Sequence, residues 1–192
     1  MDVYLTAHKR FLKLLYQQGD LKLCLKKACN LIDFYPEDIY AYEWICKIYC
    51  EHYNTNQKDC LGSLSKDVEF YASKLLELNE KSSLGLFVKA INLYNLQQYV
   101  ASREILYKIQ SLDGNNNKAI ELLALTEMQL EAFGLAENLW YQLKANENTE
   151  LGICLSYSQD ENKLKEALKI LKNKESSLDV KHALARLVSI IK

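Results

Sequence analysis

Residues 99–116 read YVASREILYKIQSLDGNN, and their pattern is the starting point for inferring the architecture. Apolar residues recur there at spacings of three and four, which predicts an amphipathic helix, and the polar run at the end predicts a turn. The same helix and polar turn return in residues 67–82 (DVEFYASKLLELNEKS) and 133–149 (FGLAENLWYQLKANENT). Copies of one pattern along a chain indicate copies of one structural unit.

The copies follow one another at a fixed interval. Glu80 and Gly114 occupy equivalent places in the pattern 34 residues apart, and Asn148 follows after another 34. A helix–turn–helix unit with a 34-residue period is that of the tetratricopeptide repeat. The repeat needs small residues where its two helices cross, and four of the five expected second-helix positions meet this requirement. The five positions hold Cys24, Val68, Ser102, Ala136 and Ala167, of which Val68 is the exception.

These observations predict an all-α chain that forms a right-handed, tetratricopeptide-repeat-like α-solenoid of about five helix pairs plus a terminal helix. The first helices of the pairs are expected at residues 3–18, 37–53, 83–96, 116–131 and 148–157. The second helices are expected at residues 20–34, 64–79, 98–112, 133–145 and 161–174. A last amphipathic helix, at residues 178–191, would cover the end of the stack.

The domain organisation that we predict is one array over residues 1–192. Its repeats span residues 3–36, 37–82, 83–116, 117–149 and 150–176. The second repeat exceeds the period because it contains residues 52–64 (HYNTNQKDCLGSL), a polar segment that we expect to be an inserted loop. The fifth helix pair is shorter than the period allows, which predicts a tight turn around residues 160–162.

Composition excludes several classes of protein. Six glycines and one proline among 192 residues are too few for the turns of a β-sandwich or barrel. Lys and Arg number 24 against 25 Asp and Glu, so the chain is not a polycation built to coat nucleic acid. We find no secretory signal and no apolar stretch of the ~20 residues that span a bilayer. We therefore expect no membrane segment and a cytoplasmic location, with a nuclear fraction as the alternative.

Catalytic motifs are missing from the sequence. The glycines are scattered singly, and none of the three histidines belongs to a zinc-protease or triad motif, so we expect no enzyme, no cofactor and no small-molecule substrate. The nearest approach to a metal site is a set of four soft ligands with a spacing that matches no common zinc motif. The four are Cys46, Cys50, His52 and Cys60. Buried thiols in a reducing compartment are the interpretation that we favour.

A candidate protein-binding surface lies in the third repeat. The first helices of such an array line its inner face. The inward residues of the third repeat are predicted to be Leu84, Phe87, Ile91 and Tyr94, which form an apolar stripe. Such a stripe is normally covered, here by residues 52–64, by a flanking part of a longer chain, or by a partner helix or peptide.

Residue types also bear on two more specialised binding modes. Repeat domains that hold chaperone C-termini need Lys, Asn and Arg at set inward positions, which here hold Trp44, Leu84 and Val88. None of these three residues can form an ion pair with a terminal carboxylate, so the sequence argues against a co-chaperone function. Direct RNA binding would draw on the tyrosines and on the basic side chains of the N-terminal third. These basic residues are Lys9, Arg10, Lys13, Lys22, Lys26 and Lys27.

Three segments carry a more specific likeness than the repeat alone. They are KKACNLIDFYPEDIYAYEWICKIY (26–49), YASKLLELNEKSSLGLFVKAINLYNLQQYVASREIL (71–106) and LALTEMQLEAFGLAENL (123–139). In this order they resemble parts of the large tetratricopeptide scaffold of the superkiller (Ski) complex. The resemblance covers roughly residues 20–175. Its most specific part is the Lys-Lys-Ala-Cys helix, the Tyr-Pro corner and the Ile-Cys pair.

The resemblance implies a function that cannot be inferred from the sequence pattern alone. Members of that family are far longer, so it implies that this chain is an internal piece of a cytoplasmic, non-catalytic scaffold. The scaffold would hold an RNA helicase and WD-repeat subunits in an assembly that feeds messenger RNA from its 3′ end to the exosome for decay and surveillance. Two alternatives remain: a stand-alone adaptor that binds a peptide or helix in its concave groove, and an RNA-binding repeat domain.

Overall fold

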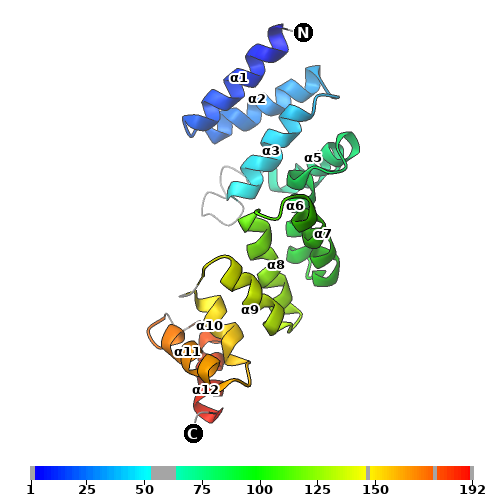
Figure 1. Cartoon of the computed structure of the whole chain (residues 1–192). Helices are drawn as coiled ribbons and strands as arrows, with labels where there is room; N and C mark the ends of the chain where they lie inside the picture. Colours follow the sequence, from blue (N-terminus) through cyan, green and yellow to red (C-terminus); the bar gives the residue numbers. More distant parts are fainter. Residues whose placement is uncertain (1–2, 53–63, 146–147, 175–176, 191–192) are drawn as a thin grey trace. The chain divides into compact units, whose positions relative to one another are not determined.

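The computed structural model describes residues 3–52, 64–145, 148–174 and 177–190, and over these ranges the chain is all-helical with no strand (Figure 1). The described helices are α1 (Val3–Gln17), α2 (Leu21–Phe34), α3 (Ile39–His52), α5 (Leu64–Leu78), α6 (Ser83–Asn95), α7 (Tyr99–Leu112), α8 (Asn117–Gln129), α9 (Phe133–Gln142), α10 (Thr149–Ser156), α11 (Glu161–Leu171) and α12 (Leu178–Ile190). None of these helices is long and apolar enough to cross a membrane.

Every described helix begins and ends within three residues of the range that the sequence predicts. The all-α class and the succession of helices are therefore confirmed. Contacts divide the chain into two compact units, Met1–Asn92 and Leu93–Lys192. The single array over residues 1–192 and the repeat boundaries stay predictions. Most of the expected inserted loop, residues 53–63, lies outside the described residues.

Small residues at the helix crossings hold each unit together. The five crossing positions predicted from the sequence, Val68 included, are all 0% exposed. In the first unit a Cβ placed on Gly85 of α6 would lie 2.9 Å from the side chain of Leu76 on α5. In the second unit a Cβ on Gly152 of α10 would lie 2.9 Å from Ile170 and Leu171 of α11. Because real Cβ contacts are longer, only a residue without a Cβ fits at these two positions while the neighbouring side chains stay in place.

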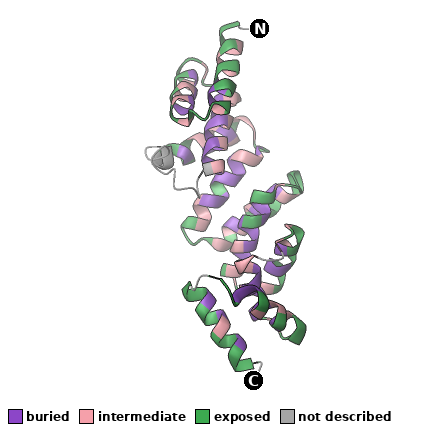
Figure 2. Cartoon of the chain, turned by 90° about the vertical axis from the view of Figure 1, so that its left-hand side faces the viewer, coloured by how far each residue is buried: buried purple, intermediate pink, exposed green. Residues whose placement is uncertain are grey.

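Larger apolar side chains fill the space beside each crossing. In the second unit Trp140 of α9 is 2% exposed and belongs to a core that also includes Leu151, Leu155 and Leu187. Figure 2 shows that buried residues lie along one side of a helix such as α12, while the other side is exposed. This is the amphipathic pattern from which the helices were predicted.

Three of the turns between paired helices, those after α1, α6 and α8, share one backbone geometry. In each of these turns the second residue after the helix end has a positive φ. These residues are Gly19 (φ 77°) after α1, Gln97 (φ 60°) after α6 and Glu131 (φ 58°) after α8. At each turn the N–H of the following residue donates to a carbonyl five positions earlier, as Gln98 does to Leu93 (2.8 Å). This is the hydrogen bonding of a glycine-type helix end, which only Gly19 adopts without a steric penalty.

Gln97→Gly is expected to raise the free energy of unfolding by about 0.5–1 kcal/mol, because glycine adopts a positive φ without the Cβ clash. Gln97→Ala is the matched control: it removes the same side chain but keeps Cβ, and should give no increase. Urea unfolding followed by circular dichroism measures both variants. If alanine stabilises the protein as much as glycine does, the backbone explanation is wrong.

Candidate functional site

The apolar stripe predicted as a binding surface lies on α6. Phe87 and Ile91 are 3% and 1% exposed, whereas Leu84 and Tyr94 are half-buried. A partner could therefore reach Leu84 and Tyr94, but not the two residues between them. Periodicity could not show this, because every residue of α6 from 85 to 91 except Lys89 is buried, so apolar spacing does not separate an inner face from a core face. The stripe stays a prediction as a binding surface.

The four-ligand set considered for zinc cannot be assembled from the described residues. Cys60 and the side chain of His52 lie outside what the structure describes. Cys46 and Cys50 are buried, and burial raises the pKa of the Cys46 thiol to about 12. Across the described ranges no three His, Cys, Asp or Glu side chains are grouped so that they could hold a metal ion.

One of the basic residues considered for RNA binding, Lys9, already forms an ion pair within the protein. Lys9 Nζ lies 2.5 Å from Asp38 Oδ2 and 5.2 Å from the centre of the Tyr40 ring. A lysine that is paired with a carboxylate offers less charge to a phosphate backbone. RNA binding through this region stays a prediction.

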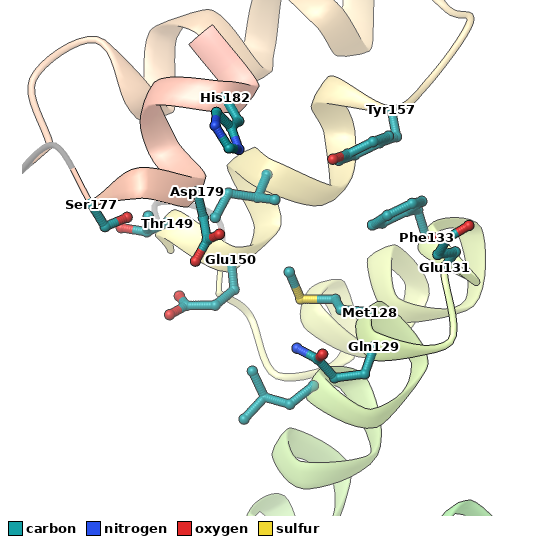
Figure 3. Close-up of a pocket in the computed structure, with 12 residues that line it drawn as sticks. Met128, Gln129, Glu131, Phe133, Thr149, Glu150, Tyr157, Ser177, Asp179 and His182 are labelled. Atoms are coloured by element: carbon teal, nitrogen blue, oxygen red, sulfur yellow. The ribbon is translucent and has the colours of Figure 1, made fainter. Parts of the chain in front are cut away.

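A pocket opens in the second unit between α8, α10 and α12 (Figure 3). Its volume is about 450 Å³. The residues that line it come from α8, from the turn that follows α8, from the beginnings of α9 and α12, and from α10 together with the residue after its end. They are Leu125, Met128, Gln129, Glu131, Phe133, Thr149, Glu150, Ile153, Tyr157, Ser177, Asp179 and His182. None of them was predicted from the sequence as a site residue.

The apolar part of the pocket is the edge of the core. Leu125, Met128 and Ile153 are partly buried and pack against the core of the second unit. The rings of Phe133 and Tyr157 stack with their centres 3.9 Å apart and their planes 2° apart. The guanidinium of Arg186, on α12, lies 4.8 Å from the centre of the Tyr157 ring. Because α9, the residue that follows α10, and α12 all contribute to this stack, one wall of the pocket is held in place.

Side-chain caps position the polar part of the pocket. Asn148 accepts a hydrogen bond from the Glu150 N–H (2.7 Å), which begins α10 at the pocket rim. Ser177 accepts one from the Val180 N–H (3.3 Å) at the beginning of α12. Caps of this kind satisfy backbone donors that a helix leaves free at its first turn. Both carboxylates that face the pocket from helix starts, Glu150 and Asp179, therefore stand on capped turns.

The pocket lining is acidic. It contains the carboxylates of Glu131, Glu150 and Asp179 together with His182, and no Lys or Arg. Figure 3 shows Glu150 and Asp179 at one end of the pocket and the Phe133–Tyr157 stack at the other. Within the described part of the chain none of the three carboxylates forms an ion pair. The site thus combines an apolar floor, an aromatic wall and unpaired negative charge.

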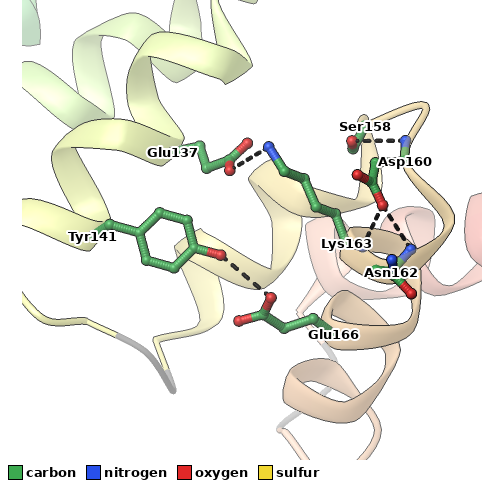
Figure 4. Close-up of polar contacts among 7 residues, drawn as sticks. All are labelled: Glu137, Tyr141, Ser158, Asp160, Asn162, Lys163 and Glu166. Carbon is green, nitrogen blue, oxygen red and sulfur yellow. Dashed lines mark hydrogen bonds and ion pairs between the residues drawn. The ribbon is translucent and has the colours of Figure 1, made fainter.

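Polar contacts between α9 and α11 support the pocket from outside its lining (Figure 4). Lys163 Nζ lies 2.6 Å from Glu137 Oε1, and the Tyr141 hydroxyl donates to Glu166 (3.3 Å). Asp160 caps α11 by accepting from the Lys163 N–H (3.3 Å). The hydrogen bond to Glu137 raises the pKa of Lys163. These contacts fix the two outer helices that flank α10.

Comparisons with known proteins agree with this architecture. No protein-family model matches the sequence, and no curated protein matches it. Solved structures do match. YrrB, reported as a TPR protein with an unusual peptide-binding site, is 14% identical, with a TM-score of 0.64 over 93% of this chain and 90% of its own.

Two further structures give the same result. PilF of Pseudomonas aeruginosa is 14% identical, with a TM-score of 0.63 over 97% of this chain and 84% of its own. TTC0263, a thermophilic TPR protein of Thermus thermophilus, is 17% identical, with a TM-score of 0.56 over 96% of this chain and 99% of its own. At such identities the likeness shows the fold, so the tetratricopeptide-like α-solenoid is confirmed. These comparisons do not support the narrower resemblance to the Ski scaffold.

Lys163→Met is expected to lower the free energy of unfolding by about 1–2 kcal/mol, because it leaves the Glu137 carboxylate, whose side chain is only 11% exposed, without its cation. Lys165→Met is the matched control on the same helix. Its partner Glu161 is 76% exposed, so water replaces the lost pair and stability should hardly change. Thermal unfolding of both variants measures the difference, and equal losses would contradict this account.

Proposed function

We propose that the chain is a non-catalytic protein-interaction adaptor and that it binds a polypeptide segment in the pocket of the second unit. The pocket itself is the observation that carries the proposal. It combines an apolar floor at Met128 with a polar rim. Binding sites commonly have this composition, because the apolar part buries side chains of the ligand and the polar groups orient them. A volume of about 450 Å³ suits a few side chains of an extended or helical segment.

The position of the pocket in the fold supports a polypeptide ligand. α8 and α10 are first helices of their pairs, and α12 follows as the next helix in line. First helices line the inner face of such arrays, where these proteins present extended binding surfaces. YrrB, which shares the fold, is reported to have a peptide-binding site.

A blocking substitution tests the proposal. Peptides selected from a displayed random library on the unmodified chain are expected to bind Met128→Arg at least tenfold more weakly, because the long side chain fills the pocket floor. Leu135→Arg is the matched control, since Leu135 is 49% exposed on α9 and does not line the pocket. Isothermal titration calorimetry measures the affinities, and circular dichroism verifies the fold. Failure to select any peptide, or full affinity for Met128→Arg, would exclude this function.

The sequence resemblance favours a second, narrower candidate. In it the chain is part of a cytoplasmic Ski-type scaffold that supports an RNA helicase and WD-repeat subunits during exosome-dependent decay of messenger RNA. Only the likeness of residues 26–49, 71–106 and 123–139 supports it. Co-purification with the tagged natural protein is the test. Absence of a helicase and a WD-repeat subunit would exclude the Ski role and leave the pocket proposal intact.

A further inference from the structure

The chemistry of the pocket specifies the kind of segment that it takes, and this inference rests on the proposed function. We infer that the pocket selects a segment with a Lys or Arg side chain next to an apolar one. The cationic group lies between the carboxylates of Glu150 and Asp179. The apolar neighbour lies on the floor formed by Leu125, Met128 and Ile153.

Charge complementarity is the first support. The lining holds three carboxylates and no Lys or Arg, and none of the three forms an ion pair among the described residues. Elsewhere in the same unit, carboxylates that lie between helices do have partners: Glu137 pairs with Lys163 and Glu127 lies beside Arg103. The carboxylates of the pocket lining therefore keep a negative charge that a cationic ligand can compensate.

Stabilisation of the two helices explains only in part why acidic residues lie at the pocket. Glu150 and Asp179 stand in the first turns of α10 and α12, where an acidic side chain interacts favourably with the helix dipole. That dipole amounts to about half a positive charge at each helix start, so net negative charge remains at the rim. It also gives no reason for the two side chains to face one pocket, as they do in Figure 3.

The site is arranged before a ligand arrives. Asn148 and Ser177 fix the turns that carry the two carboxylates, and Arg186 and Phe133 both contact the Tyr157 ring. A guanidinium or ammonium needs acceptors that are already in place, because ordering them on binding would reduce the affinity. The same negative field disfavours nucleic acid and acidic peptides.

The experiment compares library selections on the full chain and on the double variant Glu150→Gln, Asp179→Asn. Peptides selected on the unmodified chain are expected to be enriched in Lys and Arg and to bind the double variant about tenfold more weakly, with less difference at high salt. Glu80→Gln, Glu104→Gln is the matched control. It changes the net charge equally at exposed positions outside the pocket and should keep full affinity.

A charge-reversed variant, Glu150→Lys, Asp179→Lys, adds an independent test, since it is expected to select peptides enriched in Asp and Glu. Peptides that lose affinity for Met128→Arg but show no basic enrichment, or that bind the Gln–Asn variant unchanged, would overturn this inference and leave the proposed function standing. Equal weakening by the control variant would also overturn it. If Met128→Arg affects no selected peptide, the proposed function fails and this inference fails with it.

Discussion

Close crossing of paired helices is the constraint on which the rest of this molecule depends. A methyl group on Gly152 would meet the side chains of Ile170 and Leu171 at 2.9 Å, and the second-helix crossing residues, such as Ala136 and Ala167, are fully buried. Small residues there bring the backbones together, so that larger side chains such as Trp140 fill the space beside them. Buried apolar area then accumulates from pair to pair.

This constraint explains why the fold could be predicted from the sequence. Spacings of three and four define which side of a helix is buried, and small residues recurring at a fixed interval define where the helices cross. The same reasoning could not tell on α6 which residues of the predicted stripe are exposed, since Phe87 and Ile91 are buried, and the stripe stays a prediction as a binding surface. A helix that is buried on nearly all sides carries no periodic signal that separates its inner face from its core face.

The pocket could not be predicted, for a different reason. Its lining comes from segments far apart in the sequence, and three of its twelve residues, Ser177, Asp179 and His182, depend on where α12 packs. Polar residues such as Thr149, Asp179 and His182 look like ordinary surface residues when they are read along the chain. The caps Asn148 and Ser177 are local signals that predict where α10 and α12 begin, but not that both starts face one cavity.

The acidic residues of the second unit serve two different purposes, one in the fold and one at the candidate site. Glu127 is fully buried, and there the Tyr107 hydroxyl donates to it (3.0 Å) while Arg103 lies 3.8 Å away. Burial, and then the hydrogen bond to this carboxylate, raise the pKa of Tyr107, so its hydroxyl remains a donor. A buried carboxylate needs a partner within the protein. Removing one member of a buried ion pair lowers the free energy of unfolding by about 3–5 kcal/mol, because the remaining charge is left buried without compensation. Carboxylates at the rim of an open pocket are hydrated and need no such partner, so they are free to be compensated by a ligand instead.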